Sequence, residues 1–194
     1  MQTRTTQILP GREGSRVDSS GSVKSRVSVV IPCLDEAETI AECVTRARAA
    51  LDESGLEGEV IVVDNGSTDG SGDLARVAGA LVIEEPRRGY GSAYLAGLAA
   101  VQGDYVVMLD ADLTYDFEEI PRFVQALEDG AQLVVGNRMS SIAPGAMPLL
   151  SRLGNPLLSG FLNVLHRTNI RDVHCGMRAL RGWRDGRPVP TVVA

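Results

Sequence analysis

The sequence of 194 residues predicts an α/β protein, in which helices cover both faces of a mostly parallel, Rossmann-like sheet. Short runs of β-branched and other apolar residues alternate along the chain with segments of helical periodicity. These runs are apolar at nearly every position, which is typical of strands buried on both faces and therefore of parallel sheets. No segment recurs at a period of about 20–50 residues, so a solenoid is excluded.

The first half of the chain contains three predicted strands and the helices between them. The folded part begins near Arg26 with a β-branched strand over 27–31, which stops at Pro32. Apolar residues spaced three and four apart then predict one buried helix face over 36–51. The other elements are a strand at 60–63, a turn-rich stretch at 64–70, a helix at 71–78, a strand at 80–83, a loop at 84–91 and a helix at 92–101.

The second half continues the alternation and ends in a different composition. A strand is predicted at 105–109, a helix at 118–127 and a further strand at 132–135. Residues 1–25 are rich in Ser, Gly, Thr and Arg and predict a flexible leader, so one domain is expected over 26–180. Residues 181–194 are rich in Gly, Pro and Arg without periodicity, which predicts an irregular tail and a truncated or frame-shifted end.

Composition and charge argue against several classes of protein. The net charge is −6 and aromatic residues make up 4%, so no nucleic-acid partner is expected. The three cysteines have neither disulfide nor zinc spacing, which favours a reducing compartment. Because the sequence shows neither a secretory signal nor an apolar membrane span, we expect a cytoplasmic protein.

Acidic residues follow three of the predicted strands. Asp35 and Glu36 follow the first strand, Asp64 the second, and Asp110 and Asp112 the fourth. In open α/β sheets ligands bind at the carboxyl ends of the strands, so these carboxylates are candidates for a binding site. Each also has a structural alternative, because Asp and Glu at a strand end often cap the next helix.

The sharpest motif is Asp110-Ala111-Asp112, which follows an apolar strand. Residues i and i+2 of an extended chain point the same way, so both carboxylates can face one cation. In proteins Mg²⁺ is often held by one or two carboxylates together with substrate phosphates. The motif therefore suggests a metal–diphosphate site with Asp110 and Asp112 as ligands.

The loop over 86–91 places Arg87, Arg88 and Gly89 just before a helix. Backbone amides and guanidinium groups bind phosphate, although an ordinary exposed loop with a glycine cap explains the same residues. Tyr94 stands where a dinucleotide-binding fingerprint needs its third glycine, and no P-loop motif occurs. A phosphate-binding loop and a plain connection both stay open at this point.

Several motifs follow one another in a fixed order along the chain. They are Pro32 with Asp35-Glu36, VVDNGSTDGS over 62–71, Asp110-Ala111-Asp112-Leu113, Gly136-Asn137-Arg138 and DVHCGMR over 172–178. In combination they resemble family 2 glycosyltransferases of the GT-A fold. The last two are similar to the branch of dolichyl-phosphate mannosyltransferase and related polyprenyl-phosphate sugar transferases. Asn65 departs from the pattern, since many members have a second aspartate there.

The resemblance implies a metal-dependent, inverting transfer of a sugar from a nucleotide sugar, a UDP- or GDP-sugar, to a polyprenyl or dolichyl phosphate. It implies Mg²⁺ or Mn²⁺ on Asp110 and Asp112, and a base and ribose site at Pro32, Glu36 and Asp64. The catalytic candidates are Asp112, Arg138 and Asp172, with Arg138 and Arg152 facing the diphosphate or the lipid phosphate. The substrate-binding candidates are Pro32, Glu36, Asp64, Gly66, Arg88, Gly89, Asp110, Arg138, Arg152 and Arg178.

On the acceptor side, Asp172 lies in the motif that this branch places near the acceptor, where it either orients or deprotonates it. A phosphate monoester is largely dianionic at neutral pH, so a polyprenyl phosphate can attack with little help from a base. His174 is either a direct participant, as a metal ligand or base, or a structural residue. The apolar stretch 142–165 is either a lipid groove or a membrane-interface segment, with peripheral contact to the inner face of the membrane, or a helix pair packed on the sheet.

Two other functions fit parts of the sequence. Family members continue beyond the position of Arg178, so the chain is either an enzyme or a non-catalytic nucleotide-sugar-binding remnant of one. Asp110-x-Asp112-x-Thr114 also matches the nucleophile motif of haloacid dehalogenase-type phosphohydrolases. In that family the motif follows the first strand, whereas here it follows the fourth, which makes this alternative the weakest.

Overall fold

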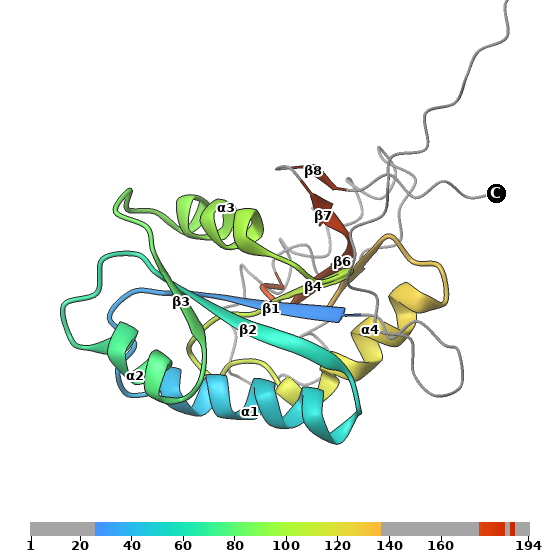
Figure 1. Ribbon diagram of the computed structural model, residues 1–194, viewed down its shortest axis with the longest axis horizontal. Helices are drawn as coiled ribbons and strands as arrows, with labels where there is room; N and C mark the ends of the chain where they lie inside the picture. Colours follow the sequence, from blue (N-terminus) through green and yellow to red (C-terminus); the bar gives the residue numbers. More distant parts are fainter. Residues whose placement is uncertain (1–25, 137–174, 185–186, 189–194) are drawn as a thin grey trace, which may run out of the picture.

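The computed structural model describes residues 26–136, 175–184 and 187–188. Six strands form one sheet in the order β3-β2-β1-β4-β6-β5 (Figure 1). The strands are β1 (Arg26–Cys33), β2 (Glu57–Asp64), β3 (Leu81–Glu84), β4 (Tyr105–Met108), β5 (Leu133–Val135) and β6 (Arg178–Arg181). The pairs among the first four in that order are parallel, and β6 is antiparallel to both of its neighbours. The predicted α/β fold with a mostly parallel sheet is confirmed.

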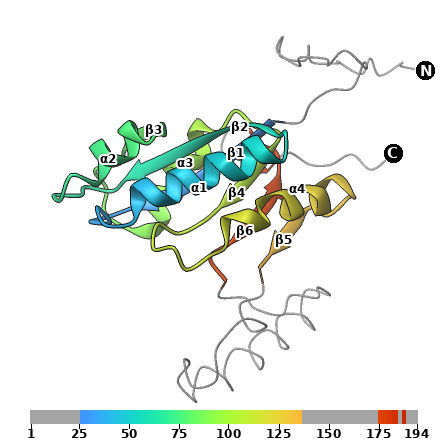
Figure 2. The same ribbon diagram turned by 90° about the horizontal axis from the view of Figure 1, so that it is seen from below.

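Helices cover both faces of this sheet (Figures 1 and 2). They are α1 (Ile40–Glu53), α2 (Ser71–Val77), α3 (Tyr90–Ala100), the 3₁₀ helix η1 (Phe117–Glu119) and α4 (Ile120–Glu128). Among the helices of the described ranges, α3 lies on one face, and α1, α2 and α4 lie on the other. Within the described ranges, every helix is too short or too polar to span a bilayer.

The two faces have separate apolar cores because the central strands are buried on both sides. The larger core joins α1 and α4 to the sheet through side chains such as Val29, Ile31 and Leu127. The smaller core joins α3 to the opposite face and includes Val30 and Tyr94. The strand residues Val29, Val30 and Ile31 are fully buried although they point to opposite faces, which is why the sequence of β1 shows no alternation of apolar and polar positions.

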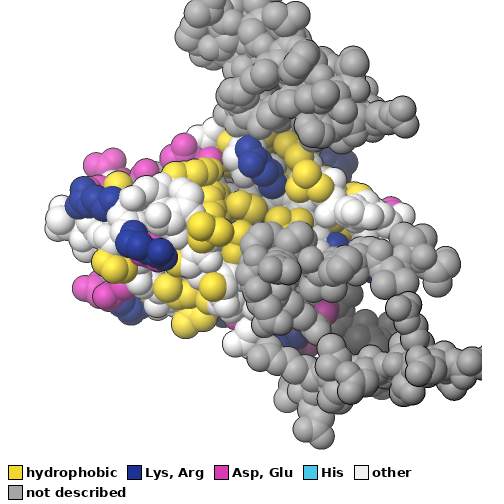
Figure 3. Space-filling view, turned by 90° about the horizontal axis from the view of Figure 1, so that it is seen from above, with side chains coloured by type: hydrophobic (Ala, Val, Ile, Leu, Met, Phe, Trp, Pro, Cys, Tyr) yellow, Lys and Arg dark blue, Asp and Glu magenta, His cyan; other side chains and the backbone are white. Residues whose placement is uncertain are grey.

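A glycine lets α3 approach the sheet closely. A Cβ atom on Gly97 would lie 2.5 Å from a methyl carbon of Val30 and 2.9 Å from one of Val63. α3 itself carries no charged side chain, and its outer residues Tyr90 and Leu95 are 59% and 62% exposed. Figure 3 shows apolar side chains gathered over the described part of this face.

The strand order places a binding crevice beside β1. The chain passes from β1 to β2 and β3 on one side and then returns to put β4 on the other side of β1. In open α/β sheets, ligands bind at such a reversal, outside the carboxyl ends of the strands. The residues that follow Cys33 and Met108 therefore meet at the expected place.

Several element boundaries differ from those predicted. The predicted helix over 36–51 begins only at Ile40, and residues 36–39 form a turn in which the amides of Glu36 and Ala37 donate to Ser71 and Asp69. The predicted helix over 92–101 begins two residues earlier, at Tyr90.

At the C-terminal end, the pattern gave no strand over 178–181, where β6 forms. The tail predicted to be irregular contains a hairpin of β7 (Trp183–Arg184) and β8 (Arg187–Pro188). The predicted leader over 1–25 and the apolar stretch over 142–165 lie outside the described residues.

Candidate functional site

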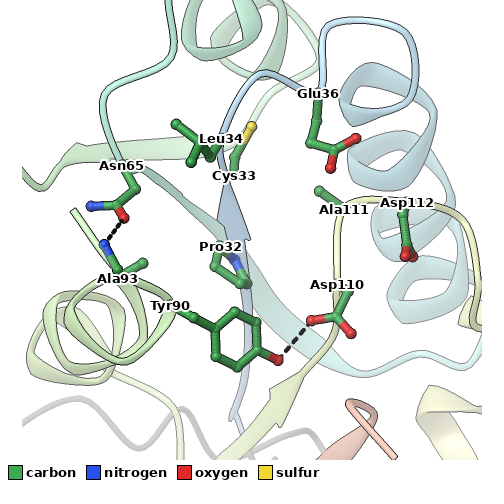
Figure 4. A pocket seen from close by; sticks show the side chains of 11 residues that line it. Pro32, Cys33, Leu34, Glu36, Asn65, Tyr90, Ala93, Asp110, Ala111 and Asp112 are labelled. Carbon is green, nitrogen blue, oxygen red and sulfur yellow. Dashed lines mark hydrogen bonds between the residues drawn. The ribbon is translucent and has the colours of Figure 1, made fainter.

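A cavity of about 290 Å³ opens where the carboxyl ends of β1, β2 and β4 meet the start of α3. This volume lies at the lower end of the range for small-molecule pockets, roughly 300–1,000 Å³. Figure 4 shows side chains from all four elements turned around the cavity. Its lining comprises Pro32, Cys33, Leu34, Glu36, Asn65, Gly89, Tyr90, Ala93, Asp110, Ala111 and Asp112.

The two aspartates of the predicted motif lie at this cavity, as expected. Asp110 is half-buried and Asp112 is exposed. One oxygen of Asp112 accepts the amide of Thr114 at 3.0 Å, in a tight turn whose middle residue, Leu113, has a φ of 58°. Thr39, just before α1, donates its hydroxyl to the carbonyl of Ala111 at 2.6 Å. The loop that carries the two carboxylates is therefore held by a hydrogen bond within its own turn and by one from Thr39.

The donor set at this cavity suits a hard divalent cation bound together with a phosphate group. Asp110 and Asp112 offer carboxylate oxygens, the ligands that Mg²⁺ and Mn²⁺ prefer. Among the described residues, no group of three or more His, Cys, Asp or Glu is placed to enclose a metal alone. A cation here would thus take its further ligands from a substrate and from water, which is the usual arrangement for Mg²⁺ with a diphosphate.

Asp110 is contacted by two tyrosines of α3. Tyr90 donates its hydroxyl to Asp110 Oδ1 at 2.8 Å (Figure 4). The hydroxyl of Tyr94 lies 3.5 Å from the same oxygen and 3.2 Å from the carbonyl of Leu109, which accepts its hydrogen bond. Burial raises the pKa of Tyr90 to about 12, and the hydrogen bond to Asp110 acts in the same direction. Burial also raises the pKa of Tyr94. Both phenols are therefore protonated at neutral pH and act as donors.

Asn65, at the end of β2, fixes the loop before α3. Its side chain is buried, its amide nitrogen donates to the carbonyls of Glu85 and Arg87 at 2.8 and 2.9 Å, and its oxygen accepts the amide of Gly89 at 2.7 Å. Gly89 has a φ of 134°, a conformation that side chains rarely adopt. The loop thus has one defined path on its way to the cavity.

The two arginines of this loop have different surroundings. Arg87 forms a two-pronged pair with Glu85, from Nε to Oε1 at 2.9 Å and from a terminal nitrogen to Oε2 at 2.8 Å. The hydrogen bonds from Arg87 lower the pKa of Glu85 to about 2. Arg88 instead donates to the carbonyl of Gly66 at 3.1 Å. Of these two arginines, Arg88 is therefore the one whose guanidinium group is not paired with a carboxylate in the described structure.

The predicted base and ribose residues divide into two groups. Pro32 and Glu36 line the cavity. Asp64 and Gly66 are not among its lining residues, although they lie beside it at the end of β2. One oxygen of Asp64 accepts the amide of Ser67 at 2.8 Å. The other oxygen packs close to Gly72, since a Cβ atom added to Gly72 would lie only 2.5 Å from it.

The predicted acceptor-side residues are only partly described. Arg178 opens β6 and donates its Nε to the carbonyl of Cys175 at 2.9 Å, and it is not among the residues that line the cavity. Arg138, Arg152, Asp172 and His174 lie outside the described residues.

Six lining residues are not among the predicted site residues: Cys33, Leu34, Asn65, Tyr90, Ala93 and Ala111. Three of them have a sequence signal, since Asn65 and Ala111 lie within quoted motifs and Tyr90 follows directly on the arginine–glycine loop. Burial raises the pKa of Cys33 to about 11, so its thiol is protonated at neutral pH.

Comparison with protein families decides the classification. The model of glycosyl transferase family 2 matches residues 28–181, which include every motif described above. The chain belongs to glycosyl transferase family 2. The phosphohydrolase alternative loses its support, because a single family model accounts for the aspartate motif and for the sheet that carries it.

Two curated relatives place the chain more narrowly within the family. The low-salt glycan biosynthesis hexosyltransferase Agl6 of Haloferax volcanii is 43% identical over 165 residues, covering 84% of this chain and 40% of that protein. The undecaprenyl-phosphate 4-deoxy-4-formamido-L-arabinose transferase of Edwardsiella ictaluri is 35% identical over 162 residues, covering 80% of this chain and 49% of that protein. The chain thus spans less than half the length of these two relatives. The resemblance to the polyprenyl-phosphate branch is confirmed.

The solved structures confirm the GT-A type of fold. The glucosyl-3-phosphoglycerate synthase of Mycobacterium tuberculosis, crystallised with Mn²⁺, uridine-diphosphate-glucose and phosphoglyceric acid, superposes with a TM-score of 0.64 at 29% identity. The match covers 81% of this chain and 56% of that chain. A protein with the same architecture therefore binds a divalent metal and a nucleotide sugar.

Proposed function

We propose that this chain binds a nucleotide sugar, a UDP- or GDP-sugar, and transfers its sugar to a polyprenyl phosphate such as dolichyl phosphate. The observation that carries the proposal is the meeting of Asp110, Asp112, Glu36 and Gly89 around one cavity at the reversal of strand order. The match to family 2 and the relative named for undecaprenyl phosphate support the reaction class and the acceptor.

The donor would lie along the carboxyl ends of the strands. Pro32, Glu36 and Asp64, at or after the ends of β1 and β2, would hold the base and ribose, with Gly66 beside them. Gly89 lines the cavity at the start of α3, where the backbone amides of the first helical turn and the guanidinium group of Arg88 in the same loop are suited to the diphosphate. Arg87 is paired with Glu85, and we assign it no contact with the diphosphate.

Asp110 and Asp112 would hold Mg²⁺ or Mn²⁺ on the diphosphate. When bound, such a cation offsets the negative charge that builds up on the departing nucleoside diphosphate. The chain's own part is to keep the two carboxylates in place, which the contacts of Tyr90 and Thr39 accomplish. The Mn²⁺ found in the structure of the mycobacterial synthase supports the same metal class here.

The transfer step would be a single displacement with inversion at the anomeric carbon. An oxygen of the acceptor phosphate forms the new bond to C1, and the bond from C1 to the diphosphate oxygen breaks, with its electron pair leaving on the nucleoside diphosphate. A dianionic phosphate has no proton to lose, so Asp172 would orient the acceptor. Arg138, Arg152 and Arg178 would contact the diphosphate or the lipid phosphate. An acceptor of this kind resides in a membrane, so we also propose a peripheral membrane contact.

A turnover assay of the full chain tests this proposal. UDP- and GDP-sugars are incubated with and without polyprenyl phosphate, in Mn²⁺, Mg²⁺ or a chelator, and release of nucleoside diphosphate is measured. We expect release that needs both the metal and the acceptor, and a loss of at least about 100-fold in Asp112→Asn. Asp73→Asn is the matched control and should leave the rate unchanged, because Asp73 is an exposed carboxylate on α2 that pairs with Arg76 in the described structure. Release that Asp112→Asn leaves intact would contradict the metal site.

A further inference from the structure

The hydrogen bond from Tyr90 to Asp110 links the start of α3 to the end of β4. The hydroxyl lies 2.8 Å from Asp110 Oδ1, and Tyr90 lines the cavity although 59% of its surface is exposed. Such an exposed tyrosine has water available as a partner, so its selection of a carboxylate at the cavity calls for an explanation.

The position of Tyr90 is set by the structure on its N-terminal side and by its neighbour in the helix. It is the first residue of α3 and follows Gly89, whose amide is bound to the side chain of Asn65 at 2.7 Å. Its ring meets that of Tyr94 edge to face, with the centroids 4.7 Å apart. The hydroxyl therefore reaches Asp110 from a fixed ring.

The other oxygen of the same carboxylate is confined from the opposite side. A Cβ on Gly176 would lie 2.2 Å from Asp110 Oδ2 and 2.7 Å from the hydroxyl of Tyr115, so the backbone of Gly176 is close against the carboxylate. The amide of Gly176 donates to that hydroxyl at 2.6 Å, which keeps the segment in place. Both oxygens of Asp110 thus have a close neighbour, and the carboxylate has little freedom to rotate.

We propose that Tyr90 is a positioning residue, whose phenol holds the Asp110 carboxylate in the orientation that a divalent cation on a nucleoside diphosphate requires. The inference rests on the proposed function, because it assigns Asp110 to a cation. A charge-assisted hydrogen bond restrains one oxygen and leaves lone pairs on both for ligation. Without the phenol, the side chain of Asp110 would have to be ordered when the cation binds. The conformational entropy lost in ordering it would lower the affinity for the cation.

Calorimetry on the full chain tests this directly, without turnover. UDP and GDP are each titrated into the protein with Mn²⁺ and with a chelator, and the ratio of the two dissociation constants gives the gain due to the metal. In Tyr90→Phe, which keeps the ring, we expect this gain to fall about fivefold while the metal-free affinity is unchanged, since about 1 kcal/mol is typical of one hydrogen bond. If only the ring of Tyr90 matters for nucleotide binding, Tyr90→Phe should change neither the dissociation constant with Mn²⁺ nor the one with the chelator, which would overturn the proposal.

A double-mutant cycle separates the hydrogen bond from other effects. In Asp110→Asn the metal gain should vanish, and adding Tyr90→Phe should then change nothing further. Tyr105→Phe makes the same chemical change at the opposite end of β4 and should leave the gain as in the wild type. A melting curve of each variant confirms that it is folded.

The outcomes distinguish a failure of the proposed metal site from a failure of the positioning role of Tyr90. If neither UDP nor GDP binds more tightly with Mn²⁺ to the wild-type chain, the proposed function fails at its metal site and the inference fails with it. If the wild type shows the gain and Tyr90→Phe shows the same gain, only the positioning role of Tyr90 is overturned. A fall in the metal-free affinity equal to the fall with metal would also overturn it, because the phenol would then act on the nucleotide.

Discussion

The side-chain oxygen of Asn65 accepts the backbone amide of Gly89 at 2.7 Å, which joins the end of β2 to the first turn of α3. The same side chain donates to the carbonyls of Glu85 and Arg87. One buried amide thus satisfies three backbone groups of a loop that has no regular structure of its own. Because Gly89 precedes Tyr90 and follows Arg88, this contact sets the position of two proposed site residues.

Replacing Asn65 by alanine should therefore weaken both stability and nucleotide binding. The side chain is 3% exposed, and loss of three hydrogen bonds at roughly 1 kcal/mol each predicts destabilisation by about 2–4 kcal/mol. Chemical denaturation measures this change. Gln125→Ala, which removes an exposed amide on α4, is the matched control and should cost less than about 0.5 kcal/mol. An Asn65→Ala chain as stable as the control would show that the loop does not depend on this contact.

The central strands could be predicted from the sequence because burial on both faces leaves an apolar run. β1, β2 and β4 are confirmed for this reason. β6 could not be predicted, because Arg178 and Arg181 enclose only two apolar residues and so short a run has no period. It becomes a strand by pairing with β4 and β5, which are distant in the sequence.

The candidate site was predictable to the extent that it depends on strand ends. Asp110, Asp112 and Glu36 lie at the cavity because parallel strands bring their carboxyl ends to one edge. Tyr90 and Asn65 could not be found in this way, since their roles depend on hydrogen bonds between elements that the sequence does not pair. Arg88, and not Arg87, is among the substrate-binding residues that the family resemblance implies, but the pairing of Arg87 with Glu85 is visible only in the structure.

The pair of Arg87 with Glu85 should make a contribution to stability that depends on pH. The Glu85 side chain is only 7% exposed, and Arg87 holds its pKa at about 2, below the ordinary value of 4.5. A lowered pKa stabilises the fold above the unfolded value, so this contribution is complete above about pH 4.5 and is lost as the pH falls towards 2. Arg87→Ala should thus lower the melting temperature by a few degrees at pH 7, and the difference from wild type should shrink between pH 4.5 and pH 2.

Melting curves of Arg88→Ala provide the control for this prediction. Arg88 contacts only the carbonyl of Gly66 among the hydrogen bonds described for it, so its removal should change the melting temperature little at any pH. A gap between wild type and Arg87→Ala that stays constant from pH 7 to pH 3 would show that the Glu85 carboxylate is not the group being stabilised.

A pair of glycine variants tests whether the carboxylate of Asp110 needs the space beside it. In Gly176→Ala the new Cβ would lie 2.2 Å from Asp110 Oδ2, so the carboxylate must turn away from its hydrogen bond with Tyr90. We expect the gain in nucleotide affinity due to Mn²⁺ to fall about tenfold or more, since two contacts of the ligand carboxylate change together. Gly91→Ala is the matched control, because a Cβ there meets nothing within 4 Å and the residue lies within α3. Alanine is also the better helix former, by up to about 1 kcal/mol, so this variant should bind as the wild type does and melt no lower. Equal metal gains in the two variants would mean that Asp110 tolerates a change of orientation, and that its place on the cation is not set by its neighbours.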